Sequence, residues 1–231
     1  DAALRDYISM NYPRVIQSKQ TGHNISDYFT YIIENWNTLN QPVTMIKGNM
    51  IDRHCSLDYF NNNYLNKHYT FLYEDKKYNQ IENISSLLNY SAFLEINNSW
   101  YADSKVHRYF STYNQLLAFL YVDPLIPSWV LSSPGSCYIV PPENILRLPK
   151  SLFESLHFLV SYTFFPSEAY FVERMLHRIY TSNDELQPYM YDFDLFMQQL
   201  ALLPDRTNET LLPPRAITRA RNFCARKLFV R

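Results

Sequence analysis

Glycine is the residue whose scarcity most constrains this chain, because only three glycines occur among 231 residues, against 13 prolines. The phosphate-binding loops of P-loop and dinucleotide-binding folds need several closely spaced glycines, since their backbones pass very close to the ligand. Gly22, Gly48 and Gly135 are far apart in the sequence. Both loop types are therefore excluded, and any nucleotide site in this chain must use another kind of binding motif.

The composition predicts one compact domain over residues 1–231. Hydrophobic residues make up 47% of the chain and aromatic residues 16%, which is enough to bury a core. A net charge of -1 argues against broad capture of nucleic acid or of an anionic membrane surface. No run of about 18 apolar residues is present, so no membrane span is expected. Cys55, Cys137 and Cys224 are too scattered for a disulfide framework or a zinc site, and we expect a reducing, cytoplasmic location.

Helical and strand patterns alternate along the chain. Phe29, Ile32, Ile33 and Trp36 recur at helical spacing, which predicts a helix over 26–37. Further helices are expected at 113–121, at 143–162, after Pro166 and, with a loop, within 183–208. Strands are expected at 43–46, 69–73, 92–96, 129–131 and 137–140. This alternation predicts the α/β class, with a mixed sheet covered by helices, followed by a basic C-terminal tail over 215–231.

Ligands of open α/β sheets bind outside the carboxyl ends of the strands, so polar residues that directly follow the predicted strands are candidates for a site. Three such clusters occur, at 47–49, at 74–75 and at 95–98. The first leads on to Arg53-His54, and the last continues to Trp100 and Tyr101. The last cluster combines an acid, amides and aromatic rings, a mixture suited to sugars, although an ordinary solvated loop has the same composition.

The helix that opens with Pro166 carries the principal candidate for catalysis. Its predicted buried stripe consists of Val172, Met175, Leu176 and Ile179. The residues expected to be more exposed are Glu168, Glu173, Arg174, His177 and Arg178. Glu168 falls in the first turn, where the helix dipole favours a charged carboxylate that can act as a base. The alternative is that Glu168 only complements the dipole.

Other segments have a functional and a plainer interpretation. Gly135 beside a predicted strand permits a close approach of a ligand, or forms an ordinary tight turn. The basic residues of the tail suit a diphosphate, or form a solvated helix face. Asp192-Phe193-Asp194 imitates a metal-binding Asp-X-Asp, yet it lies inside a predicted helix. His54-Cys55 lacks a third group for a thiol nucleophile, so a buried cysteine is expected.

Five ordered blocks resemble a glycosyltransferase-like family of fungi, bacteria and large algal viruses. The blocks are Gly22-His23-Asn24 with the helix to Trp36, Lys47-Gly48-Asn49 with Arg53-His54, residues 95–101, residues 134–141, and Glu168 with Glu173-Arg174. More distantly, the glycine-serine strand and the later Pro-X-Glu helix are similar to the core-2 branching and peptide xylosyltransferase group. That similarity implies a single-domain nucleotide-sugar transferase (GT-A-like) fold that works without a metal. Family members also begin with a strand ahead of the Gly22 block, where this chain has only residues 1–20.

The resemblance implies the transfer of a hexose or pentose from a nucleoside-diphosphate sugar, a UDP-sugar first of all, to a glycan hydroxyl, with inversion and Glu168 as general base. The location is then the cytoplasm, of the host cell if the protein is viral. No cofactor and no metal ligand are assigned, and a divalent metal is left open. The donor-binding candidates are Gly22, His23, Asn24, Lys47, Gly48, Asn49, Arg53, Arg219, Arg221 and Lys227. The sugar- or acceptor-binding candidates are Glu95, Asn97, Asn98, Trp100, Gly135 and Ser136.

Two rival functions follow from the same residues. One is a non-catalytic glycan-binding or structural protein that keeps the fold, and it would bind no sugar nucleotide. The other is a nucleotide-sugar hydrolase, which would release free sugar without depending on an acceptor.

Overall fold

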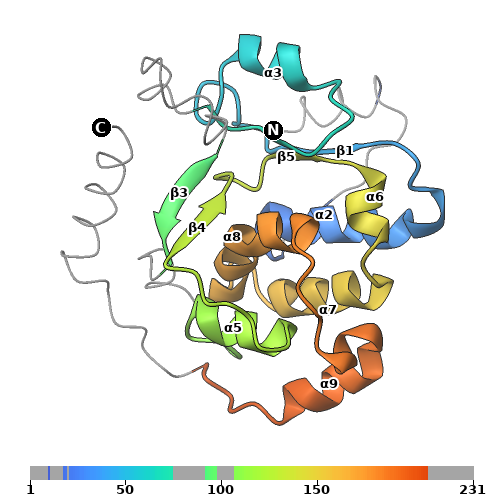
Figure 1. The fold of residues 1–231 in the computed structure, drawn as a ribbon, viewed down its shortest axis with the longest axis vertical. Helices are drawn as coiled ribbons and strands as arrows, with labels where there is room; N and C mark the ends of the chain where they lie inside the picture. The colour runs from blue at the N-terminus through green and yellow to red at the C-terminus, as the bar shows by residue number, and fades with distance from the viewer. Residues whose placement is uncertain (1–9, 11–17, 20, 75–91, 98–106, 208–231) are drawn as a thin grey trace.

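The computed structural model describes residues 10, 18, 19, 21–74, 92–97 and 107–207, without the side chains of 94–96 (Figure 1). Of residues 1–20, which precede the Gly22 block, only 10, 18 and 19 are therefore among the described residues. Asn98 and Trp100 also lie outside them, as does the basic tail with Arg219, Arg221 and Lys227.

Short strands alternate with helices over the described part of the chain. The strands are β1 (Val43–Met45), β2 (Thr70–Phe71), β3 (Phe93–Ile96), β4 (Trp129–Ser132) and β5 (Tyr138–Val140). The α-helices are α2 (His23–Glu34), α3 (Leu57–Asn63), α5 (Tyr113–Leu120), α6 (Pro142–Leu146), α7 (Lys150–Ser161), α8 (Ser167–Thr181) and α9 (Phe193–Ala201). The 3-10 helices are η1 (Trp36–Thr38) and η3 (Pro188–Tyr191).

The strands form two small antiparallel sheets. One has the order β1-β5-β2, with Thr44 and Thr70 on either side of Ile139, and the other pairs β3 with β4. The expected α/β class is confirmed, because the described residues combine helices with small sheets. The expected mixed sheet is not seen in the described residues, where every pairing between strands is antiparallel.

Strand β5 is buried on both faces, which explains its continuous apolar sequence. Because successive side chains point to opposite faces, Tyr138 and Val140 join the main core, whereas Ile139 joins a second, smaller cluster. That second cluster also contains Met50, Cys55, Leu72 and Cys137. It anchors the segment that follows β1, and it confirms that Cys55 and Cys137 are buried core residues.

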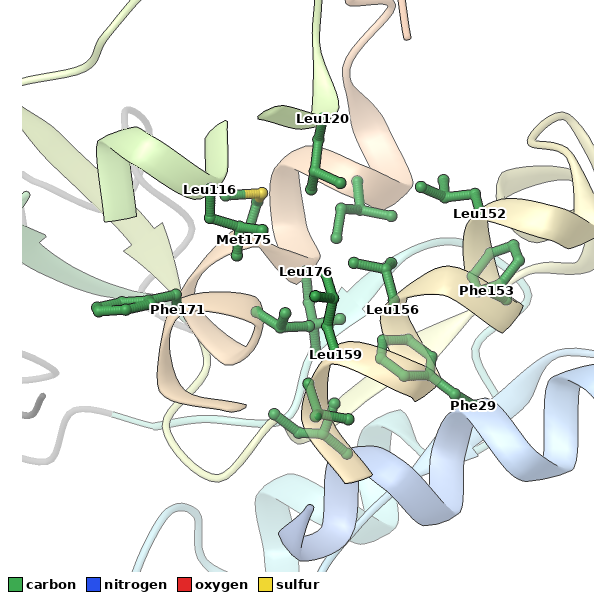
Figure 2. Packing of buried hydrophobic residues seen from close by; sticks show 14 of the residues in the cluster. Phe29, Leu116, Leu120, Leu152, Phe153, Leu156, Leu159, Phe171, Met175 and Leu176 are labelled. Carbon is green, nitrogen blue, oxygen red and sulfur yellow. The ribbon is translucent and has the colours of Figure 1, made fainter. Parts of the chain in front are cut away.

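The main core lies between α2, α5, α7 and α8. Figure 2 shows side chains from these four helices pointing toward one another, among them Phe29 of α2, Leu116 of α5, Leu156 of α7 and Met175 of α8. In Figure 1 the β1-β5 ladder runs between α3 on one side and the α2 and α7 helices on the other. Within the described residues no helix is long and apolar enough to cross a membrane.

The predicted helix 143–162 is two helices, because Leu148-Pro149 interrupts it. Proline lacks an N–H group and pushes the residue before it away from helical geometry. Accordingly α6 ends at Leu146, and Pro149 is the N-cap of α7. The predicted segment 183–208 similarly divides into η3 and α9.

Helix α8 is more buried than its sequence pattern suggested. The predicted stripe of Val172, Met175, Leu176 and Ile179 is buried as expected. The expected exposure of Glu168 and Arg174 is wrong, because both side chains are buried, at 0% and 7% exposure. The reason is that α8 packs against α2, α6 and α7 and also against β4, so that neighbours cover most of its circumference.

Candidate functional site

Gly22 starts α2 at one edge of the site. It has a φ of +64° and is the N-cap of the helix, and its N–H donates to the Thr163 carbonyl at 2.9 Å. A Cβ on Gly22 would lie 2.4 Å from the Val160 carbonyl oxygen, so only glycine fits there. This contact with the end of α7 places the following residues, His23 and Asn24, beside the loop that leads into α8.

Gly135 lies in a tight turn between β4 and β5. The Ser136 N–H donates to the Ser133 carbonyl at 2.9 Å, and Gly135, at the third position with a φ of +78°, follows Pro134. Proline then glycine at the two central positions is typical of a type II turn. The turn itself therefore explains why proline and glycine occur at positions 134 and 135, without a ligand.

Side chains from two helices hold the Gly135 backbone. The Gly135 N–H donates to Glu173 Oε1 of α8 at 2.6 Å, and its carbonyl accepts from Asn24 Nδ2 of α2 at 2.7 Å. Asn24 Nδ2 also donates to the Tyr28 hydroxyl at 2.9 Å, which in turn donates to the Ile46 carbonyl at the end of β1 at 2.8 Å. This network joins four segments of the chain: α2, the end of β1, the turn at Gly135 and α8.

The segment from Lys47 to His54 closes the same region from the β1 side. Its backbone is tied by the His54 N–H to the Met50 carbonyl at 2.8 Å. Lys47 Cε and His54 Nε2 lie 2.7 Å and 3.0 Å from the point where a Cβ on Gly135 would stand. Because Gly135 has no side chain, the lysine stem and the imidazole can both occupy that space.

A cavity of about 540 Å³ opens where these segments meet. Its charged lining consists of Lys47, Arg53 and Arg174 with Asp27 and Glu173. Its aromatic lining consists of Phe93, Phe164, Phe165 and Tyr170. The remaining described lining residues are Ser18, His23, Asn24, Asn49, His54, Ser132, Pro134 and Gly135. Cations, carboxylates and aromatic rings in one cavity suit a ligand that carries phosphate and hydroxyl groups.

The structure brings together many of the predicted binding residues. His23, Asn24, Lys47, Asn49, Arg53 and Gly135 all line the cavity. Other predicted residues do not line it. Gly22 packs on Val160, and Ser136 is fully buried beside Gly135. A Cβ on Gly48 would have no atom of the described residues within 4 Å, its two chain neighbours apart.

The β3 end of the predicted site is separate. Asn97 lies outside the cavity lining, and its Nδ2 donates to Asn114 Oδ1 and to the Pro127 carbonyl, both at 2.7 Å. Glu95 lies on β3 opposite Val130 of β4.

Glu168, the predicted base, is fully buried and absent from the cavity lining. Its Oε1 accepts from the backbone N–H groups of Arg108, Tyr109 and Phe110 at 2.9, 2.7 and 3.3 Å. Its Oε2 accepts from the Tyr162 hydroxyl at 2.7 Å. A carboxylate with four donors and no exposed surface holds the 108–110 backbone in place, so the geometry does not support its assignment as the base.

Sequence reasoning missed several lining residues. Asp27 lies four residues after His23 on α2, and Tyr170 precedes Glu173 and Arg174 by three and four residues on α8. Residues at these spacings share one helix face, so periodicity could have found both once one neighbour was placed. Phe164 and Phe93 carried no comparable signal. Glu173 and Arg174 were part of a motif block, but without a separate role.

His54 is a cavity residue whose titration is strongly perturbed. Burial, followed by the nearby charges of Lys47 and Arg53, lowers the pKa of His54 to about 4. The imidazole is therefore neutral at pH 7, which leaves the cations as the positive charges beside it. Burial similarly raises the pKa of the Cys137 thiol to about 12, so this thiol is protonated and not a nucleophile.

Stability should fall as the pH drops from about 6.5 to about 4. In that window His54 of the unfolded chain takes up a proton that His54 of the folded chain does not, so the native state is disfavoured by up to about 3 kcal/mol. Burial also lowers the pKa values of His157 and His177, which act in the same direction. Urea unfolding across this range should show a shallower fall for His54→Gln, and an identical fall would contradict the lowered pKa.

The predicted metal motif has a structural role. Asp192 caps α9, where its Oδ1 accepts from the N–H groups of Asp194 at 2.9 Å and Leu195 at 3.0 Å. Among the residues with described positions, no group of three or more His, Cys, Asp or Glu side chains is arranged to hold a metal ion.

Comparison of the chain with protein-family models, with curated proteins and with solved structures found no match.

Proposed function

We propose that this chain is a glycosyltransferase that moves a sugar from a nucleoside-diphosphate sugar to a hydroxyl of a glycan. The observation that carries the proposal is the cavity of about 540 Å³, whose lining includes the cations Lys47, Arg53 and Arg174 and the carboxylates Asp27 and Glu173. Its volume is within the range of small-molecule sites. The GT-A-like fold, the UDP-sugar donor and the cytoplasmic location belong to the same proposal and rest on the sequence resemblance.

Each part of the reaction has a candidate group in the cavity. Cationic side chains neutralise the diphosphate, which gains charge as it leaves. The acceptor hydroxyl attacks the anomeric carbon and gives its proton to a carboxylate, while the bond from that carbon to the phosphate oxygen breaks. The aromatic side chains offer flat apolar faces to the sugar or to the nucleotide base.

Glu173 replaces Glu168 as the base in this proposal. Glu173 is half-buried and lines the cavity, whereas Asp27 is exposed and Glu168 is enclosed. The Gly135 nitrogen lies 2.6 Å from Glu173 Oε1, and this hydrogen bond orients the carboxylate. An oriented, ionised carboxylate at the cavity wall is what proton abstraction from a hydroxyl requires.

The first test is a panel of nucleoside-diphosphate sugars, scored by thermal shift and by nucleotide release with and without glycan acceptors. A donor at about 100 times its Kd should stabilise the protein by about 2.7 kcal/mol. Release that depends on an acceptor supports transfer, whereas release without an acceptor indicates a hydrolase. No shift with any donor overturns the proposal and favours the non-catalytic rival, and binding without release in the presence of acceptors overturns the transfer reaction.

In the same assay Glu173→Gln should lower turnover by about 10² or more while donor binding persists. Glutamine keeps an oxygen that can accept from the Gly135 N–H, so the wall of the cavity stays in place. The matched control is Glu34→Gln, an exposed position at the end of α2, which should leave turnover unchanged. Full turnover in Glu173→Gln would remove Glu173 from the mechanism.

A further inference from the structure

His54 has an unusual environment for a buried polar side chain. It is 8% exposed, it lines the cavity, and its Nε2 has no hydrogen-bond partner in the part of the chain that the structure describes. Buried polar atoms are nearly always paired, because an unmade hydrogen bond costs free energy. An unpaired nitrogen at the wall of a cavity points to a partner that a ligand supplies.

The groups around His54 indicate the charge of that ligand. Lys47 and Arg53 belong to the same segment and lie close enough for their charges to act on the imidazole. The ring centroid of Tyr73 lies 6.4 Å from that of His54. Glu173 accepts a hydrogen bond from the Gly135 N–H. Lys47, Arg53 and His54, named here the cationic corner, thus combine two positive charges with an unpaired buried nitrogen.

We propose that the cationic corner binds the phosphate groups of the ligand, with His54 Nε2 donating a hydrogen bond to a phosphate oxygen. This assignment rests on the proposed function, because the ligand that it places is the nucleotide-sugar donor. It moves the phosphate site from the C-terminal basic residues to the segment that follows β1. Lys47 Cε and His54 Nε2 lie 2.7 Å and 3.0 Å from the point where a Cβ on Gly135 would stand. A phosphate bound to the Lys47 ammonium group can therefore reach His54 Nε2 once the flexible lysine side chain changes its rotamer.

The position of Gly135 gives the bound donor a direction. The side of Gly135 where a Cβ would stand faces Lys47 and His54, and its N–H faces Glu173. A diphosphate in the cationic corner therefore places the bond to the sugar near Gly135, within reach of the Glu173 carboxylate. The cationic corner and Glu173 therefore lie on two different sides of Gly135.

The experiment is isothermal titration calorimetry of the full chain with inorganic pyrophosphate. We expect Lys47→Met and Arg53→Met each to raise the Kd about tenfold or more, because hydrogen bonds to charged groups are the stronger ones. His54→Phe should raise it similarly, and His54→Gln should recover a large part, since its amide can donate. The control is Lys67→Met, a change at an exposed lysine outside the cavity.

Lys47 is half-buried and Arg53 exposed, so both variants should fold, which circular dichroism confirms before titration. An unchanged Kd in Lys47→Met and Arg53→Met, or no binding of pyrophosphate to the wild type, overturns the assignment. An unchanged Kd in His54→Phe overturns the hydrogen bond. If pyrophosphate binding depends on the cationic corner but no sugar is transferred, this inference stands and the proposed function is rejected. If sugar transfer occurs but does not depend on the cationic corner, the proposed function stands and this inference is rejected.

Discussion

Glu168→Ala should lower the free energy of unfolding by about 3 kcal/mol or more. The substitution removes the acceptor shared by the N–H groups of Arg108, Tyr109 and Phe110 and the acceptor of the Tyr162 hydroxyl. Each buried donor left without a partner costs about 1–3 kcal/mol. For a chain of this length the loss corresponds to a drop of about 6–12 °C in Tm, which differential scanning calorimetry would detect.

Glu168→Gln separates the structural role of this residue from a catalytic one. Glutamine keeps an oxygen for the three backbone N–H groups, and its amide can donate to the Tyr162 hydroxyl, so we expect a loss of only about 1 kcal/mol. Glu34→Ala, at an exposed carboxylate, should change stability by less than about 0.5 kcal/mol. An unchanged Tm in Glu168→Ala contradicts the structural role. Lost transfer with unchanged stability in Glu168→Gln would restore Glu168 as the base.

Gly22→Ala should destabilise the protein by about 3 kcal/mol or more. The φ of +64° alone disfavours alanine by about 1 kcal/mol. In addition, the new Cβ would lie 2.4 Å from the Val160 carbonyl oxygen and 2.7 Å from Ser26 Cβ, which forces α2 away from the end of α7. Urea unfolding at constant pH measures the loss.

The matched control for this change is Gly48→Ala. Apart from its two chain neighbours, no described residue has an atom within 4 Å of a Cβ at Gly48, so the extra methyl group is not crowded by them, and stability should change by less than about 0.5 kcal/mol. Equal effects in the two variants would show that the packing of α2 on α7 does not require glycine. A second consequence is specific to Gly22: the displaced helix carries His23 and Asn24, so ligand binding should weaken along with stability.

Hydrophobic periodicity located most of the described helices and strands, because a buried stripe or run is a local property of the sequence. The short run around Ile139 is an example, since burial on both faces leaves a continuous apolar pattern. Helix α3 was not predicted, and it buries none of its residues. Strand pairing was not accessible in the same way. That β5 lies between β1 and β2, antiparallel to both, depends on contacts between residues such as Thr44 and Ile139 that are far apart in sequence.

In the candidate site, too, some features could be predicted from the sequence and others could not. Ordered motifs pointed to Asn24, Lys47, Arg53 and Gly135, which the structure gathers around one cavity. The exposure of Glu168 could not be predicted from its place in the first turn of α8, because it depends on which elements cover that turn. The 108–110 backbone and Tyr162 do so, and no pattern within α8 records their presence.

The two carboxylates of α8 hold two separate pieces of backbone, Glu168 the 108–110 segment and Glu173 the turn at Gly135. Their spacing of five residues amounts to about 7.5 Å along a helix axis. One residue inserted between them would turn one carboxylate by about 100° relative to the other, so that only one of the two attachments could survive. Helix α8 therefore fixes the distance between the 108–110 segment and the Gly135 turn. Substitution of one apolar residue of the helix by another keeps that distance, whereas an insertion or deletion between Glu168 and Glu173 changes it.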